Sequence, residues 1–308
     1  MLLRSGVVLA IFSYILWGIT PLFYRLLPGA EPLELLAQRV IWSIPFLLLI
    51  RLMIKNKTAW QQVWADKRSI ILCLFSSAIM AISWGAFTYA LTHGQVLAAS
   101  LGYFINPLFS ILLGVVFLHE RLVVAEKMAV LLIFSGVCFQ ILQYGELPLL
   151  ALVMGSAFAV YGLIRKFIRF DVITSLFIEA IWLLPVAGGI TWWLSVNESS
   201  AVAAGDWQIK LLYMLAAPVT IIPLLFFTAA IKRTTLTVIG LAQYIEPTIQ
   251  FLLAVFLFNE LFDWVKGVSF SLIWLGLLCC IIALLHKRYN EYHKRVPYVT
   301  GRDKTPKL

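Results

Sequence analysis

Apolar residues fill long, almost uninterrupted stretches of this 308-residue chain. Each stretch has about 20 residues, enough for a helix to cross a hydrocarbon core of about 30 Å at about 1.5 Å per residue. The stretches lack the alternation of apolar and polar positions that a membrane β-barrel needs. The pattern therefore predicts ten transmembrane helices, over residues 6–27, 33–54, 69–91, 96–118, 125–144, 148–168, 172–196, 210–231, 236–258 and 264–286.

Composition agrees with a membrane protein, since 62% of the residues are hydrophobic and 13% are charged. The charged residues are also distributed unevenly. Of the 24 Lys and Arg residues, 20 fall in alternate loops and in the tail from Lys287 onward. Because positive loops stay on the cytoplasmic side, we expect both termini in the cytoplasm. The net charge of +9 then reflects topology and a basic tail near anionic lipid, and it does not predict a nucleic-acid partner.

The chain repeats itself at an offset of about 140 residues, without a gap from the second predicted helix to the fifth. Pro107 falls on Pro247 and Gly136 falls on Gly276. Further matches are Ile41-Trp42 with Ile181-Trp182, Pro45 with Pro185, Phe87-Thr88 with Phe227-Thr228, and Glu120 with Glu260.

Each repeat holds five predicted helices, so the second repeat must enter the membrane in the opposite orientation. We therefore expect an all-α integral membrane fold of two inverted five-helix repeats, residues 5–144 and 148–286, around a central cavity. Residues 287–308 form a basic cytoplasmic tail. Inverted repeats are typical of secondary transporters, in which the two halves exchange conformations, although channels also have them.

Several motifs resemble one family of transporters. They are ELLAQRVIWS at 34–43, ASLGYFINPL at 99–108, YGLIRK at 161–166, IEAIWLLP at 178–185 and QYIEPT at 243–248. Together they resemble the drug/metabolite transporter superfamily, EamA family, and within it the RarD-type permeases. The resemblance implies ten helices, a central cavity, and export of small metabolites or drug-like compounds across the bacterial inner membrane. It does not extend to Glu246, where RarD-like sequences carry a small residue.

One face of the fourth predicted helix is polar, and so is the equivalent face of the ninth. The spacing places these residues within about a third of the helix circumference. Lipid is a poor neighbour for such a stripe, so we expect it to line a substrate cavity, with packing between helices as the alternative. The predicted cavity residues are Ser100, Tyr103, Asn106 and Ser110 in the fourth helix and Gly240, Gln243, Glu246 and Gln250 in the ninth.

Asn106 and Glu246 each lie ten residues into their helices, which is about 15 Å and close to the membrane midplane. Pro107 and Pro247 follow them directly. Proline cannot bond the carbonyl four residues earlier, so each is predicted to kink its helix or to free an acceptor. Trp17 and Trp84 lie deep in other helices, where they could stack on a flat substrate or pack in the core.

Three residues are predicted to carry charge inside the membrane. An acidic residue at mid-membrane costs about 2.5 to 3.5 kcal/mol on insertion scales, so Glu246 is a candidate for proton coupling or cation binding. The alternative is a neutral carboxyl bonded to Gln243. Arg39 and Glu179 are equivalent in the repeats, but their depths differ by about 10 Å, so we expect separate partners. Arg39 could otherwise reach toward headgroups or hold a substrate carboxylate.

The sequence contains no motif for a catalytic nucleophile, a nucleotide or a metal, and its four cysteines all fall within predicted helices. We therefore predict no enzyme activity, no cofactor and no metal. The expected function is a secondary transporter that exports small amphipathic molecules by alternating access, with a small molecule, the lipid bilayer and protons as partners. The alternatives are an uncoupled facilitator or channel, and an intramembrane enzyme using Glu246 and Glu179. The sequence specifies neither the substrate nor an oligomeric state.

Overall fold

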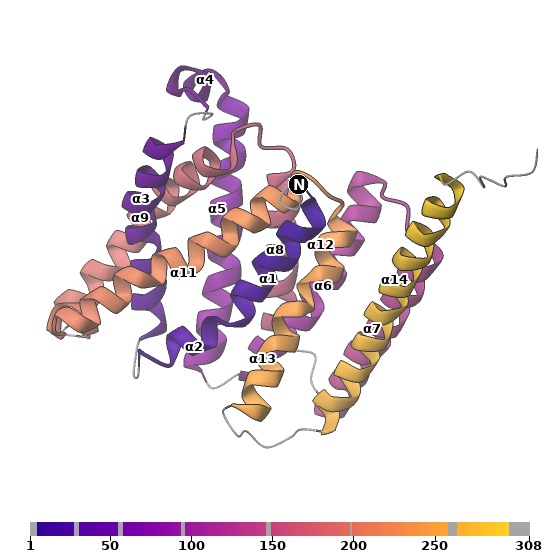
Figure 1. Ribbon diagram of the computed structural model, residues 1–308. Coiled ribbons are helices and arrows are strands. Elements are labelled where there is room, and N and C mark those ends of the chain that lie inside the picture. Colours follow the sequence, from indigo (N-terminus) through magenta and orange to yellow (C-terminus); the bar gives the residue numbers. More distant parts are fainter. Residues whose placement is uncertain are drawn as a thin grey trace, which may run out of the picture.

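The computed structural model describes residues 5–27, 31–54, 58–93, 96–145, 149–197, 199–257 and 264–295, without the side chains of 91–92, 96–101 and 284–295. Within these ranges every regular element is a helix (Figure 1). The helices are α1 Gly6–Gly18, α2 Thr20–Tyr24, α3 Pro32–Met53, α4 Trp60–Ala65, α5 Lys67–Thr92, α6 Val96–Leu118, α7 Val124–Tyr144, α8 Leu149–Arg165, α9 Val172–Val196, α10 Ala201–Ala204, α11 Trp207–Ile231, α12 Leu236–Gln243, α13 Ile245–Phe256 and α14 Trp264–Arg295.

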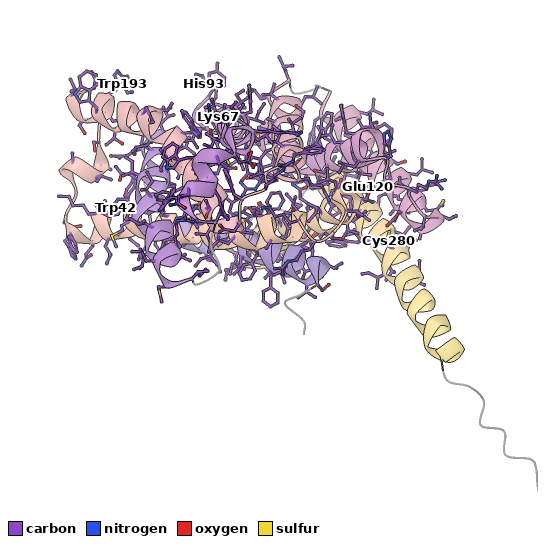
Figure 2. The ribbon with its side chains drawn as sticks, turned by 90° about the horizontal axis from the view of Figure 1, so that it is seen from above. Trp42, Lys67, His93, Glu120, Trp193 and Cys280 are labelled. Carbon is purple, nitrogen blue, oxygen red and sulfur yellow. The ribbon has the colours of Figure 1, made fainter. Side chains whose placement is uncertain are left out.

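Eight helical segments of the described chain are long and apolar enough to cross a membrane. The two other apolar helical segments are shorter, Gly102–Leu118 and Leu149–Arg165, and they fall within the fourth and sixth predicted ranges. Large apolar side chains such as Leu52 and Leu142 are exposed, whereas Ser13, Ser76 and Thr228 are fully buried. Figure 2 shows Trp42 and Trp193 at the periphery of the bundle. This distribution is typical of a helical protein surrounded by lipid, so the predicted all-helical membrane fold is confirmed at this level.

Corresponding helices begin at corresponding positions in the two halves of the chain. Helices α3, α5, α6 and α7 begin at Pro32, Lys67, Val96 and Val124, and α9, α11, α12 and α14 begin 140 residues later. Their packing also corresponds: α5 and α6 pack on α8, while α11 and α12 pack on α1. Similarly, α3 contacts α11 and α9 contacts α5.

The two prolines of the polar stripes have different surroundings. Helix α6 continues through Pro107, whereas a turn at Tyr244, three residues before Pro247, separates α12 from α13. The Tyr244 hydroxyl donates to the backbone oxygen of Phe104 in α6 at 2.9 Å. A methyl group added to Gly240 would lie 2.8 Å from the carbonyl oxygen of Pro107. Helices α6 and α12 therefore cross in direct backbone contact.

Helices α7 and α14 form a long pair at one side of the molecule (Figure 1). Small residues allow their close approach. A methyl group at Gly136 would lie 3.1 Å from the Ser269 carbonyl oxygen, and one at Gly276 would lie 3.0 Å from the Ala129 carbonyl oxygen. The Ser269 hydroxyl donates to the Gly136 oxygen at 3.0 Å. Small-residue contacts of this kind are the usual way in which membrane helices approach each other closely.

Candidate functional site

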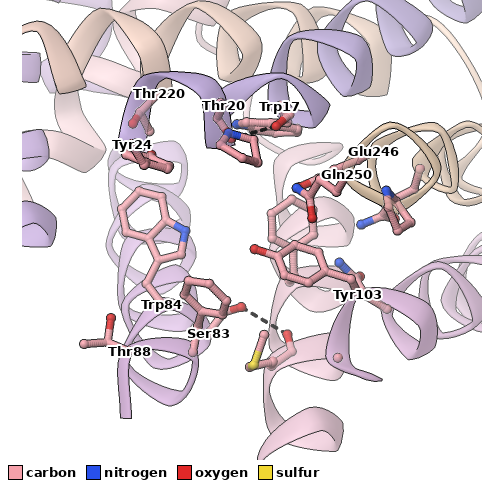
Figure 3. Close-up of a pocket in the computed structure, with 18 of the residues that line it drawn as sticks. Trp17, Thr20, Tyr24, Ser83, Trp84, Thr88, Tyr103, Thr220, Glu246 and Gln250 are labelled. Carbon is pink, nitrogen blue, oxygen red and sulfur yellow. Dashed lines mark hydrogen bonds between the residues drawn. The ribbon is translucent and has the colours of Figure 1, made fainter. Parts of the chain in front are cut away.

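A cavity of about 650 Å³ lies among the helices. Its lining comes from α1, α2, α3, α5, α6, α8 and α11 to α14. Tyr24 of α2, Pro32 in the first turn of α3, and Lys266 in the first turn of α14 place it toward the end of the molecule opposite the N-terminus (Figure 1). Figure 3 labels ten of the lining residues: Trp17, Thr20, Tyr24, Ser83, Trp84, Thr88, Tyr103, Thr220, Glu246 and Gln250.

The structure brings most of the residues predicted for the cavity to this one space. Seven of them contribute to the lining, and so do Pro247 and Arg39. The seven are Trp17, Trp84, Tyr103, Asn106, Gln243, Glu246 and Gln250.

The other predicted residues lie elsewhere or fall outside the description. Ser110, Gly240 and Pro107 meet at the crossing of α6 and α12, where the position of a Gly240 methyl is 3.4 Å from the Ser110 Cβ. Ser100 belongs to α6, but its side chain lies outside the described residues, as does Glu260. Glu179 lines a second, smaller cavity. Each polar stripe therefore has two parts: one part contacts the neighbouring helix at the crossing, and the other part lines the cavity.

Aromatic rings make up much of the cavity wall. Tyr103 stands edge-on to Phe87 with ring centroids 5.8 Å apart, and Trp17 stands edge-on to Phe158 at 6.1 Å. In Figure 3 the Trp84 ring and the Tyr103 hydroxyl point into the open space between the helices. A mostly apolar wall with a few polar groups is the usual composition of a small-molecule site. The cavity therefore fits an amphipathic guest better than an inorganic ion.

The polar groups gather where α6 meets the break between α12 and α13. Gln250 Nε2 donates to Glu246 Oε1 at 3.3 Å. Asn106 Oδ1 and Gln243 Oε1 are buried and have no hydrogen-bond partner among the described residues. An unsatisfied buried acceptor costs about 1–3 kcal/mol. These oxygens are therefore suited to receive donors from a guest.

Arg39 of α3 supplies a positive charge to the cavity. Its guanidinium carbon lies 4.8 Å from the centroid of the Trp84 ring, and its Nε is buried without a hydrogen-bond partner in the described part of the chain. Stacking on tryptophan stabilises the guanidinium while leaving its edge available. Arg39 and Glu179 do not form the ion pair that their equivalence suggests, as the depth estimate predicted, because Glu179 is paired with Arg165.

The Arg165–Glu179 pair was not foreseen. Arg165 Nη1 lies 2.5 Å from Glu179 Oε2, and Tyr161 bonds both residues, accepting from Arg165 at 2.9 Å and donating to Glu179 at 3.3 Å. Arg165 and Glu179 are 1% and 5% exposed, so this network is buried between helices α8 and α9. The sequence places Arg165 among the loop cations. The four-residue spacing of Tyr161 and Arg165, which puts both on one helix face, was the available signal.

A second cavity, of about 40 Å³, is lined partly by residues of this network and partly by residues that also line the large cavity. Its lining includes Tyr161 and Glu179 of the network, together with Arg39 and Trp84, which also line the large cavity. An apolar cluster that includes Tyr14, Tyr161, Phe227 and Ile231 packs beside it. The network therefore lies next to the large cavity, toward the end of the molecule that carries the N-terminus.

Polar contacts join the loops at that same end. Glu120 accepts hydrogen bonds from the backbone nitrogens of Leu236 at 2.7 Å and Thr237 at 2.9 Å, at the start of α12. Asp171 caps α9 and accepts from the backbone nitrogen of Thr58 at 2.8 Å. Burial opposes the ionisation of Asp171, but the hydrogen bonds from Thr174 and Thr58 outweigh it and hold its pKa below the usual range.

The part of the chain that the structure describes has no group of three or more His, Cys, Asp or Glu residues able to hold a metal ion. The network of Arg165, Glu179 and Tyr161 offers paired charges and no free nucleophile. The large cavity itself is lined by one carboxyl group, three side-chain amides, one guanidinium, one lysine ammonium group and several aromatic rings.

Comparisons with known proteins point in one direction. A family described as the EamA-like transporter family matches residues 4–142. An uncharacterized transporter of Vibrio cholerae is 37% identical over 89% of this chain and 91% of its own length. Protein RarD of Salmonella typhimurium is 37% identical over 94% of this chain and 98% of its own.

More distant similarities extend over as much of the chain. A Pseudomonas aeruginosa protein named chloramphenicol-sensitive protein RarD is 29% identical over 89% of this chain and 92% of its own length. One solved crystal structure aligns with a TM-score of 0.65 at 18% identity, covering 90% of this chain and 98% of that one. At this identity the likeness shows a shared fold alone.

Proposed function

Because the chain belongs to the EamA-like transporter family, we propose that it is a secondary transporter that carries small amphipathic molecules across the bacterial inner membrane. The observation that carries this proposal is the cavity of about 650 Å³, which has aromatic walls and a few polar groups. Such a cavity buries a small guest while its polar groups set the orientation.

The proposed architecture has ten spans arranged as two inverted repeats, residues 5–144 and 148–286. Eight spans meet the length and hydropathy criteria, and α6 and α8 supply the other two. The 140-residue offset between helix starts and the corresponding helix contacts in the two halves support this arrangement. Two similar halves can exchange conformations, which moves access to a shared site from one side of the membrane to the other.

The cavity faces outward in this proposal. Its lining reaches the end opposite the N-terminus, while the Arg165–Glu179 network and the cluster around Tyr14 and Phe227 fill the other end. The Lys and Arg bias of the loops supports a cytoplasmic position for that filled end. The direction of transport, export, is proposed from the resemblance to the family, and in export the filled end opens to load substrate from the cytoplasm.

Glu246 is the proposed coupling residue. It is 8% exposed and lines the cavity, and its neighbour Gln250 supplies a single hydrogen bond at 3.3 Å. No described Lys or Arg forms an ion pair with it. A carboxyl group with this little support can exchange a proton as a guest enters or leaves.

Counterflow in proteoliposomes tests the proposal. Vesicles loaded with unlabelled chloramphenicol, chosen because one relative is named for sensitivity to it, should accumulate labelled chloramphenicol transiently. A pH gradient should increase the accumulation in wild-type protein and should have no effect on Glu246→Gln. Glu126→Gln, at the start of α7 and away from the cavity, is the matched control and should behave as wild type. Counterflow that is independent of the pH gradient in all three proteins would indicate a facilitator. A complete lack of counterflow would contradict transport of chloramphenicol.

A further inference from the structure

Three buried residues with acceptor oxygens line the cavity on either side of the crossing of α6 with α12 and α13. Asn106, Gln243 and Glu246 are 5%, 3% and 8% exposed, and all three line the cavity. Asn106 Oδ1 and Gln243 Oε1 have no donor within the described chain, and Glu246 receives one bond, from Gln250. We propose that these residues form an ammonium subsite, and that the substrate of the proposed transport carries a primary amine.

The helix crossing holds these residues near one another. Gly240 lets α12 touch the backbone of α6 at Pro107, the residue after Asn106. Gln243 lies three residues beyond Gly240, nearly one turn along α12, and Glu246 lies a further three residues along, in the first turn of α13. The hydrogen bond from the Tyr244 hydroxyl to the Phe104 carbonyl oxygen also joins α6 to the turn between α12 and α13. The acceptors therefore lie at a helix crossing that is held in place before the guest binds, so the site is preorganised.

A protonated primary amine matches these acceptors in number and in charge. It offers three N–H donors and accepts none, and the subsite offers it a carboxyl group and two unsatisfied amide oxygens, beside the amide N–H donors that Asn106, Gln243 and Gln250 also carry. A hydroxyl group would satisfy only one of the three acceptors. Hydrogen bonds to a charged group are also worth about twice those between neutral groups.

The surrounding residues favour an organic ammonium ion over a bare inorganic cation. Tyr103 lies beside Asn106 on the same helix, edge-on to Phe87 at 5.8 Å, and Trp17 also lines the cavity. Aromatic faces attract organic ammonium groups and bury the carbon skeleton that carries them. Two cationic residues, Arg39 and Lys266, line the same cavity; Arg39 stacks on Trp84, and neither forms an ion pair with a described carboxylate, so Glu246 supplies the negative charge of the subsite.

Calorimetry on the full-length protein in lipid nanodiscs tests the subsite with two probes of nearly equal shape. At neutral pH 2-phenylethylamine is charged, and 2-phenylethanol is its neutral counterpart. We expect the amine to bind at least tenfold more tightly, since hydrogen bonds from a charged donor supply this difference. Glu246→Gln and Asn106→Leu should each remove most of the preference and leave the binding of the alcohol unchanged. Glu126→Gln should keep the preference.

Two results would overturn the assignment. One is equal binding of the two probes, or no binding of either, to wild-type protein. The other is displacement of the amine by sodium chloride as effectively as by a second amine, which would make the subsite a site for an inorganic cation. The inference rests on the proposed function, and the chloramphenicol counterflow assay separates the two. Because chloramphenicol carries no primary amine, counterflow of labelled 2-phenylethylamine is measured beside it. If either compound shows counterflow while the amine preference is absent, the subsite fails and the transporter stands; if neither compound shows counterflow, both proposals are wrong.

Discussion

At the scale of single residues, the most demanding feature is the Arg165–Glu179 pair. Both side chains are removed from water, and their mutual attraction compensates only while both are present. The Ser175 hydroxyl accepts a hydrogen bond from the guanidinium of Arg165, and the Tyr161 hydroxyl donates one to the carboxylate of Glu179. The pair is therefore more sensitive to the loss of one partner than to the loss of both.

Arg165→Met and Glu179→Leu should each lower the free energy of unfolding by about 3–5 kcal/mol, because each leaves a buried charge without its partner. The double variant should recover most of that loss. Unfolding in mixed detergent micelles measures the three variants in one thermodynamic cycle. Arg121→Met, at an exposed position, should have little effect. Additive losses in the double variant would show that the two residues act independently.

Asp171 should make stability depend on acid. Its pKa is held below the usual value in the folded protein, so its contribution is present above the unfolded value of about 3.9 and is lost as the pH falls through the folded value. Asp171→Asn keeps an acceptor at the start of α9 but cannot titrate. The midpoint of thermal unfolding should therefore fall less between pH 6 and pH 3 in the variant. Parallel curves for the two proteins would exclude this contribution.

The candidate site was partly predictable from single residues. Asn106 and Glu246 share a polar stripe whose depth follows from helix geometry, and the structure places both in the cavity. For Arg39 the sequence left open contact with lipid headgroups and contact with a substrate carboxylate, and the structure places it in the lining of the same cavity. Arg165 was misjudged because a charge near a helix end reads as a loop residue in sequence. Its burial depends on α9, a separate helix, which brings Glu179 opposite it.

At the scale of helices, the crossing of α6 and α12 depends on the absence of a side chain at Gly240. Gly240→Ala should destabilise the protein by about 1–3 kcal/mol, because the methyl group would lie 2.8 Å from the backbone oxygen of Pro107, which cannot move independently of its helix. Thermal unfolding in detergent measures the effect. Gly189→Ala, where nothing lies within 4 Å, should be neutral or slightly stabilising. Equal behaviour of the two variants would mean that the crossing tolerates separation.

The helix periodicity of the sequence did not predict correctly which residues of the polar stripes line the cavity near this crossing. A stripe defined by angle predicts which face is polar, and it assigned Ser110 and Gly240 to the cavity together with Asn106. Angle does not specify which length of the face meets a neighbouring helix. The crossing at Pro107 divides the stripe, with small residues at the contact and hydrogen-bonding residues in the open space.

At the scale of the whole molecule, the proposed orientation predicts which loops are accessible. Ser199 and Arg121 are exposed and lie in loops that the predicted topology assigns to opposite sides. Ser199→Cys should react with a membrane-impermeant maleimide in intact cells, and Arg121→Cys should react only after permeabilisation. The wild-type cysteines are buried or half-buried and provide the background measurement. The reverse pattern would invert the proposed topology and make the cavity of this structure face the cytoplasm.

The all-helical membrane character followed from the sequence because hydrophobic length is a property of the chain alone, whereas the ten spans in two inverted repeats stay a prediction. The starts of α3 and α9, at Pro32 and Val172, already appear in the sequence as a repeat. The sequence does not show which helices pack against each other, because all the helices are apolar on most faces. Which helix packs on which is set by shape and by small residues. Examples are Gly6, which lies against Arg233 and Thr234 just after α11, and Gly18, which lies against Ile249 of α13; no periodicity in the sequence records these contacts.

Helices α7 and α14 are equivalent to each other in the two repeats, so the contact between them corresponds to itself when the repeats are exchanged. Gly136 contacts Ser269, and a shift of 140 residues turns this contact into the one between Gly276 and Ala129, at the same interface. In the proposed exchange of the two halves, this interface is therefore the part that has no reason to change. Spectroscopic labels across it would give one distance throughout the cycle, a stationary reference, whereas labels between α1 and α11 would report which way the protein faces.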